Sequence, residues 1–519
     1  MGLFSATAIV MGSMIGSGIF IVSADMSRTL GSPALLIGAW LVTAGMTLIG
    51  ALSYGELAAM MPKAGGQYVY LREALGPFWG FLYGWTLFLV IQTGTIAAVG
   101  VAFGKFLGVF FPKVSAGNWL WHMGHVPAWQ VGPMVLGNMD IGLNTANLSA
   151  IVVITVLTLL NTLGVKMGAA VQNVFTSAKV VALAAVVLVG LLAKNAGAIA
   201  ANFTSAAGAG WHNFWAGAGW HTMHAVQVGV GGATIGNPTA YVGLFTVVAV
   251  VQVGSLFSSD AWNNVTFTAG EIRNPKRNLP LSLAIGTGVV LLLYVLCNFV
   301  YLSVLPLTGA PAAATIAGRG IEFASEDRVA TAVMEQAGAT LGFVGYGAKL
   351  MAAAILVSTF GCVNGMLLAG ARVYYAMSRD GLFFESVGRL SERTKAPVNS
   401  LWVQWAWTCL LCLSGSYGQL LDYVIFAVLV FYVLTIAGLF VLRRTRPDAV
   451  RPYRAIGYPV LPGLYIVMAL WICAVLLRYK PQYTWPGLLL VLLGVPVYVV
   501  WTRMGRPGAG SAELSEKAV

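Results

Sequence analysis

Apolar segments alternate with shorter polar ones along almost the whole chain, and most are long enough to reach the roughly twenty residues that a membrane-crossing helix needs. The pattern predicts an all-α membrane protein with about twelve transmembrane helices. We assign 1–502 to one transmembrane domain and 503–519, rich in Gly, Ser and charged residues, to a flexible tail. The expected spans are 3–28, 34–60, 78–111, 147–164, 166–193, 240–268, 281–305, 342–378, 398–415, 419–442, 460–477 and 484–502.

The first apolar segment contains Gly16-Ser17-Gly18 near its middle. Glycine is among the residues that a helix interior tolerates least, so we expect the helix to unwind there. In lipid, unpaired backbone groups occur only where they line a cavity or meet a ligand. The N-terminus of the resumed helix, near Gly18, suits a carboxylate. The alternative interpretation is that the two glycines only let another helix pack closely.

The sixth apolar segment carries a second interruption, Ser258-Ser259-Asp260-Ala261-Trp262-Asn263, in its middle. Ser, Asp and Asn side chains compete for backbone hydrogen bonds and favour helix ends over helix interiors. Two broken apolar helices, one in each half of a chain, are typical of a transporter whose site lies at the bilayer midplane between internal repeats.

Composition agrees with a membrane location. Hydrophobic residues make up 58% of the chain and charged residues 9%, whereas soluble domains average about 25% charged residues. The net charge of +12 does not indicate nucleic-acid binding, because most of the lysines and arginines fall in loops on one side of the membrane. This bias predicts a multi-pass protein of the plasma membrane with both termini in the cytoplasm.

Lys179 lies well inside the fifth apolar segment, and the next charged residue is Lys194. A charged side chain at that depth is costly unless it finds a partner. We expect its ammonium to reach the broken first helix. The alternative is that the side chain extends along the helix to the membrane surface.

Asp260 is the acidic residue in the middle of the sixth span. It is a candidate counter-charge for a substrate ammonium or a cationic side chain. The alternatives are a cap for the resumed helix or an internal partner for a basic residue.

Cysteine and histidine give little support to redox or metal chemistry. All five cysteines fall within apolar spans, so we expect no disulfide framework and no cofactor. His122-x-x-His125 and His221-x-x-His224 would place imidazoles on one helical face, but we expect no metal site because other ligands are scarce in these loops. The long loops 112–146 and 194–239 have no role that the sequence explains.

At the two interruptions the chain resembles a known family. Gly-Ser-Met-Ile-Gly-Ser-Gly-Ile-Phe at 12–20 is similar to the first-helix motif of the amino acid-polyamine-organocation transporters. Trp262-Asn263-Asn264, followed by the stretch from Glu271 to Pro280, resembles their L-type amino acid transporter branch. The resemblance runs from about Leu3 to Trp501. It implies a LeuT-like fold, with inverted repeats at about 3–193 and 240–442 and two extra helices at 460–502.

The resemblance also implies a site. The substrate carboxylate would meet N–H groups of Ser17, Gly18 and Ile19. Its ammonium would meet carbonyls of Met14 and Ile15 and those around Phe257 and Ser258, with Asp260 nearby. Phe257 would cover the bound substrate, with plain packing as its alternative. The ammonium of Lys179 would replace the sodium ion of sodium-coupled relatives and bridge to the eighth span, where Ser358 and Thr359 supply hydroxyl groups.

These observations predict a sodium-independent transporter that exchanges neutral amino acids by alternating access. Proton-coupled symport and basic amino acid or polyamine antiport are the alternatives. A membrane enzyme is disfavoured because no nucleophile–base pair is visible in the sequence. A channel is disfavoured because two helices that are each interrupted at one depth suit one enclosed solute better than a continuous pore. L-type transporters of animals bind a glycoprotein through a cysteine in the loop after the third span. The loop 112–146 has none, so we expect no disulfide-linked heavy subunit and a monomer or weak oligomer.

Overall fold

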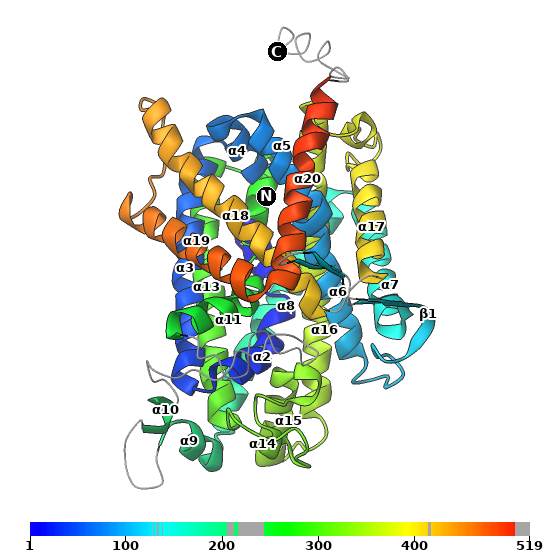
Figure 1. The fold of residues 1–519 in the computed structure, drawn as a ribbon, viewed down its shortest axis with the longest axis vertical. Coiled ribbons are helices and arrows are strands. Elements are labelled where there is room, and N and C mark those ends of the chain that lie inside the picture. Colours follow the sequence, from blue (N-terminus) through cyan, green and yellow to red (C-terminus); the bar gives the residue numbers. More distant parts are fainter. Residues whose placement is uncertain are drawn as a thin grey trace.

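A computed structural model describes residues 1–127, 129–131, 134–136, 139–204, 212–215, 243–413 and 417–503. The molecule is a bundle of helices that run mostly along its long axis (Figure 1). Within the described residues, nine helices are long and apolar enough to cross a membrane. They are α3 (Pro33–Met60), the continuous run of α5 (Pro77–Thr86), η2 (Leu87–Ile91) and α6 (Gln92–Leu107), α7 (Thr145–Thr162), α8 (Val165–Leu192), α13 (Pro275–Val304), α16 (Gly347–Arg379), α18 (Tyr417–Thr445), α19 (Val460–Tyr479) and α20 (Pro481–Arg503).

The other three predicted spans contain shorter apolar helices: α1 (Leu3–Met14), α11 (Leu244–Ser258) and α17 (Val398–Leu413). Two of them are short because the chain unwinds where the sequence predicted it. After α1 the backbone resumes as η1 (Gly18–Phe20) and α2 (Val22–Leu30). After α11 it resumes as α12 (Asn264–Phe267) and η3 (Ala269–Glu271). Both interruptions are therefore present in the fold.

The two broken segments pack against each other inside the bundle. Helix α11 contacts α2 and η1, and α1 contacts α12. Helix α1 also packs on α13, α8 and α16, while α6 packs on α7, α16, α17 and α18. Long helices thus surround both interruptions and shield them from lipid, which is the condition under which unwound backbone is tolerated at membrane depth.

The third span contains a local irregularity that the sequence did not predict. Residues Leu87–Ile91 form a π-helical turn between α5 and α6. The hydroxyl of Thr93 donates to the carbonyl of Phe88 at 2.6 Å. Single π turns inside helices are common at functional sites, and this one leads directly into Gln92 and Thr95.

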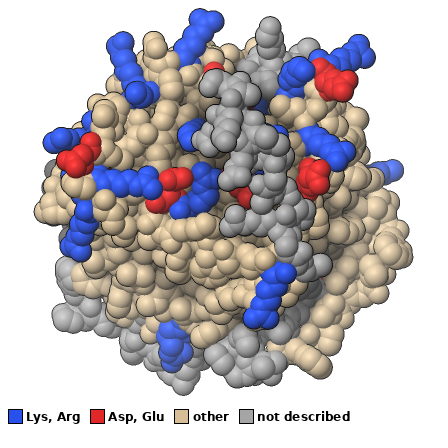
Figure 2. Space-filling view, turned by 90° about the horizontal axis from the view of Figure 1, so that it is seen from above, with Lys and Arg blue, Asp and Glu red and all other residues tan. Residues whose placement is uncertain are grey.

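A short helix, α4 (Gln67–Leu75), follows the second span. It lies at the same end of the bundle as the C-terminal end of α20 (Figure 1). Figure 2 views that end and shows many lysine and arginine side chains around its rim, with fewer acidic ones. The remaining helical elements are α9 (Ala196–Asn202), α10 (His212–Trp215), α14 (Ile316–Arg319), η4 (Ser325–Asp327), α15 (Val329–Leu341) and η5 (Glu385–Gly388).

The loop between the third and fourth spans forms β structure. Strand β1 (Trp119–Val126) pairs antiparallel with β4 (Met139–Asn144), and β2 (Trp129–Val131) pairs with β3 (Met134–Leu136). The expectation that His122 and His125 share a helical face is therefore wrong, because both lie on a strand. The pair His221-x-x-His224 lies outside the described residues.

Candidate functional site

The site begins at the end of α1, where the helix leaves carbonyl groups without helical partners. The carbonyl of Met14 accepts a hydrogen bond from the Tyr294 hydroxyl at 3.0 Å. The carbonyl of Ile15 accepts from Lys179 Nζ at 2.9 Å and from the Ser358 hydroxyl at 3.2 Å. The carbonyl of Met14 also accepts from the N–H of Gly16 at 2.9 Å. Each of the two carbonyls that the resemblance assigned to a substrate ammonium thus already accepts two hydrogen bonds from the protein.

Lys179 projects from α8 into the bundle and is 1% exposed. Its ammonium donates to the carbonyls of Gly12, at 2.6 Å, and Ile15. These carbonyls lie at the C-terminal end of α1, where the helix dipole favours a cation. The side chain therefore does not extend to the membrane surface, and its charge stabilises the end of the broken helix.

The two predicted hydroxyl groups of the eighth span behave differently. Ser358 donates to the carbonyls of Ile15 and Gly16, both at 3.2 Å, so it joins Lys179 at the break. Thr359 instead donates within its own helix, to the carbonyls of Ile355 and Leu356. Helix α16 thus contacts the break through Ser358 and not through the hydroxyl of Thr359.

A small cavity lies between the two interruptions, and we call it the break cavity. Helix α6 and helix α16 complete its wall with Thr95, Val99 and Cys362, which the sequence did not indicate as site residues. Ile15 and Ile19 are buried but are not among the residues that line it. The predicted residues that do line it are Met14, Ser17, Gly18, Phe257, Ser258 and Asp260.

Asp260 lies in the second interruption and is 9% exposed. Its carboxylate accepts a hydrogen bond from the Tyr432 hydroxyl of α18 at 2.6 Å. It is not the cap of the resumed helix, because the N-cap of α12 is Asn263. None of the ion pairs found among the described residues includes Asp260. The next residue, Ala261, has a φ of 63°, a left-handed conformation that is rare outside glycine and often occurs at functional sites.

A second small cavity adjoins the first and is called here the adjoining cavity. The two share Thr95, Asp260 and Ala261. Its wall combines polar and aromatic side chains, including Gln92, Asn264, Tyr83 and Tyr432. Asp260 therefore stands at the junction of the two cavities, where it can contact a solute that extends from one into the other.

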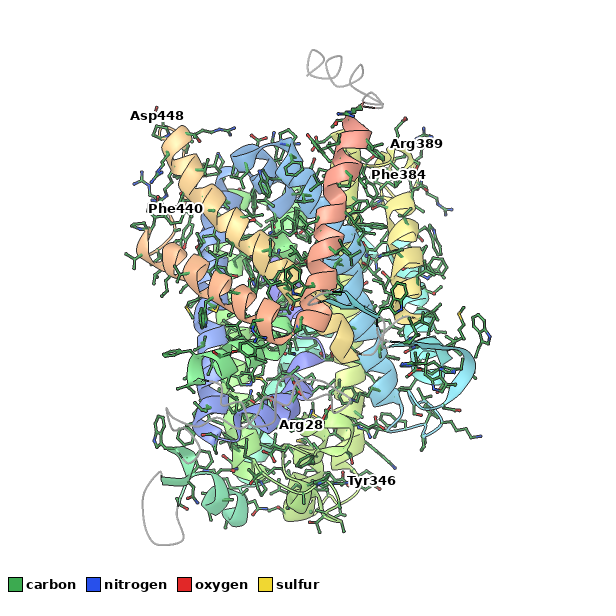
Figure 3. All side chains as sticks on the ribbon, in the orientation of Figure 1. Arg28, Tyr346, Phe384, Arg389, Phe440 and Asp448 are labelled. Carbon is green, nitrogen blue, oxygen red and sulfur yellow. The ribbon has the colours of Figure 1, made fainter. Side chains whose placement is uncertain are left out.

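An ion pair links a broken segment, or the chain that continues it, to a neighbouring element at each end of the bundle. At the end that holds α4, Arg372 Nε lies 2.6 Å from Glu271 Oε1. At the opposite end, Arg28 Nη1 lies 2.7 Å from Asp327 Oδ1, in the lower half of Figure 3. Both pairs join a broken segment, or its continuation, to a neighbouring part of the chain.

A buried site between two interrupted membrane helices is typical of a transporter. The comparison with protein families assigns the class: a model described as amino acid permease matches residues 1–498. The chain belongs to that family, which consists of membrane transporters and not of enzymes. This confirms the resemblance found from the two sequence motifs.

Individual relatives align over nearly the whole chain. The serine/threonine exchanger SteT of Bacillus subtilis is 27% identical over 499 residues, which cover 96% of this chain and 95% of that protein. The human b(0,+)-type amino acid transporter 1 is 28% identical, over 97% of this chain and 88% of its own length. The human large neutral amino acids transporter small subunit 2 is 27% identical, over 96% and 79%.

Proposed function

We propose that the protein exchanges neutral amino acids across the plasma membrane by alternating access, independently of sodium. The observation that carries this proposal is the ammonium of Lys179 on the carbonyls of Gly12 and Ile15. The positive charge of this ammonium at the end of α1 fills the position that a coupling cation would otherwise need. The similarity to a serine/threonine exchanger and to a large neutral amino acid transporter supports exchange and neutral substrates.

In this proposal the substrate binds in the break cavity. Its carboxylate meets the N–H groups of Ser17, Gly18 and Ile19, because the start of a helical turn favours an anion. Its ammonium meets the carbonyls near Met14 and Phe257 and the hydroxyl of Ser258. The carbonyl of Met14 has two lone pairs and already accepts from Tyr294 and from the N–H of Gly16, so the substrate ammonium takes the place of one of these donors. Phe257 covers the bound solute, whose side chain extends toward the adjoining cavity.

The proposed architecture has twelve spans, arranged as two inverted repeats of five at about 3–193 and 240–442 with extra helices at 460–502. The transmembrane domain is 1–502, and 503–519 is a flexible tail. Both termini face the cytoplasm, in line with the lysines and arginines of the loops. We expect a monomer or weak oligomer without a disulfide-linked heavy subunit, because 112–146 contains no cysteine.

A second candidate function is antiport of basic amino acids or polyamines. The observation that favours it is Asp260, a carboxylate at the junction of both cavities that receives a hydrogen bond from Tyr432. A cationic side chain that reaches Asp260 from the break cavity would pair with this carboxylate. Proton-coupled symport is a third candidate, in which Lys179 carries the proton.

The deciding experiment is uptake of labelled alanine and leucine into proteoliposomes, without sodium and with or without unlabelled amino acid inside. Uptake that requires internal amino acid is the expected result. Concentrative uptake into empty liposomes under an imposed pH gradient would contradict exchange and establish proton symport. Uptake of lysine or putrescine, with none of alanine or leucine, would establish the second candidate.

A further inference from the structure

The hairpin formed by β1 and β4 projects large apolar side chains without covering them. Leu120, Trp121 and Met123 are 55%, 59% and 62% exposed, and Trp129 at the start of β2 is 72% exposed. Seven of the eight residues of β1 are exposed, and only Gly124 is half-buried. Apolar surface of this kind on a membrane protein calls for a partner.

The pairing of the two strands gathers the polar side chains on one face, which also carries Trp119 opposite Asn144. His125 pairs with Asp140 and His122 pairs with Gly142, which puts both imidazoles on the face of Asp140. Trp121 pairs with Leu143 and Gly124 with Ile141, on the opposite face. Leu120 and Met123 are extra residues in β1 that have no partner in β4. Each of these bulges shifts the register by one residue, so His122 and His125 come to lie on the same face although they are three positions apart. The hairpin is therefore amphipathic.

The polar face is held by hydrogen bonds. His125 Nδ1 lies 3.1 Å and His122 Nε2 lies 3.3 Å from the same oxygen of Asp140. The hydrogen bond from His125, joined by that from His122, lowers the pKa of Asp140 below its usual value. A charged carboxylate and two imidazoles need water, so this face cannot enter the acyl chains.

The hairpin is attached directly to the end of a membrane span. Strand β4 ends at Asn144, whose side chain accepts from Asn147 N at 2.8 Å and so caps α7. The exposed Leu148, Val152 and Val156 continue along α7. Leu148 is about 6 Å along the helix axis from Asn144, so lipid-facing surface begins within one turn of the hairpin. Figure 1 shows the hairpin running across the long axis and extending sideways beyond α7.

We propose that the hairpin of residues 119–126 and 139–144 is an interfacial anchor that lies in the headgroup region of the bilayer. Its apolar face, with Trp121 and Val126, contacts the acyl-chain boundary, and the face of His122, His125 and Asp140 contacts water. Tryptophan prefers this depth because its ring is largely apolar while its N–H can reach water or headgroups. The continuity of the exposed surface from the hairpin into α7 identifies lipid as the occupant.

Two neighbouring positions on one strand test the proposal. Nitroxide labels are placed at Val126→Cys on the apolar face or at His125→Cys on the polar face, in a background whose five native cysteines are replaced by alanine and whose transport is checked first. Tyr346→Cys is the aqueous control, since Tyr346 is 67% exposed and lies nearer the lower end of the molecule than the hairpin (Figure 3). The labelled proteins are reconstituted in phosphatidylcholine–phosphatidylglycerol nanodiscs.

The depth of each label is measured from its collision rates with two relaxing agents. Oxygen concentrates in the lipid, and a nickel chelate stays in water. We expect the label at 126 to be several-fold more accessible to oxygen than to nickel, and the labels at 125 and 346 to show the reverse. A Trp121→Glu change should move the label at 126 into water, whereas Trp121→Phe should not. Equal nickel access at 126 and 346 would overturn the proposal. So would protection of position 126 from both reagents, because it would mean that protein, such as a second copy, covers the hairpin.

Discussion

A β-carbon built on Gly18 would lie 2.9 Å from the Cα of Ser258. The backbone of the first interruption therefore touches the backbone of the second, and the break cavity exists beside this contact. Real β-carbons do not approach another atom so closely, and a backbone atom cannot rotate away. Glycine is required at position 18 because of this approach, not because of its own backbone conformation.

Gly18→Ala should separate the two interruptions and reduce exchange more than about tenfold, equivalent to roughly 1.4 kcal/mol of lost binding. The measurement is initial uptake into proteoliposomes, with folding checked by size-exclusion chromatography and melting temperature. Gly45→Ala in α3 is the matched control, since a β-carbon there would have no neighbour within 4 Å. Normal uptake by the Gly18→Ala variant would show that the contact does not shape the site.

The interruptions could be predicted because they break a local rule. Gly16, Gly18 and Asp260 are unfavourable in the middle of an apolar helix, and that signal does not depend on the rest of the fold. Thr95, Gln92 and Tyr432 gave no such signal. A membrane helix is apolar on most of its surface, so the face that it turns to a cavity depends on how its neighbours pack.

The hairpin was missed for a different reason. Two bulges shift its register, so His122 and His125 share a face although their spacing of three residues would separate them on a regular strand. The sequence pattern matched neither a helix nor a strand. Cross-strand pairing with Asp140 is a long-range contact that local periodicity does not contain.

Lys179→Ala should abolish or uncouple transport. The change would leave the carbonyl of Gly12 without the hydrogen bond that it receives at 2.6 Å, and would remove the cation from the end of α1. We expect the protein to fold but to lose exchange in the same uptake assay. Lys349→Ala is the control, because Lys349 is an exposed lysine near the start of α16. This change also removes a positive charge, but from the surface, and should leave uptake unchanged. Transport at the wild-type rate in Lys179→Ala would refute the role proposed for this lysine.

Asp260→Asn separates the two substrate classes. An amide oxygen can still accept the hydrogen bond from the Tyr432 hydroxyl, so the local structure should persist while the charge is lost. If basic side chains reach Asp260, competition by unlabelled lysine against labelled leucine should weaken more than about tenfold, because an ion pair in a buried site is lost. Competition by unlabelled alanine should change less.

The comparison of the two competitors within one variant controls for a general defect in transport. Equal competition by lysine in wild type and Asp260→Asn would exclude this carboxylate as a cation site. The neutral exchange proposed above would then stand alone. A parallel loss with both competitors would instead mean that Asp260 contacts the ammonium group shared by all substrates.

Glu56 connects the second span to the last third of the chain and is completely buried. Its carboxylate lies 2.6 Å from Arg443 Nη2 and 3.3 Å from Arg451 Nε, and it accepts from the backbone N–H of Ala455 at 2.7 Å. Glu56→Gln would leave two guanidinium groups without a counter-charge. Breaking a buried ion pair from one side costs about 3–5 kcal/mol, so the melting temperature in nanodiscs should fall clearly.

Glu385→Gln is the control for this change. Glu385 also pairs with an arginine, Arg389, at 3.3 Å, but both side chains are 72% exposed. Water screens such a pair, and exposed pairs contribute little to stability, so its loss should leave the melting temperature unchanged. If the two variants melted alike, the Glu56 network would not be what joins α3 to α18 and the segment before α19. If only Glu56→Gln is destabilised, movement of α3 during transport must carry α18 with it or break this network in each cycle.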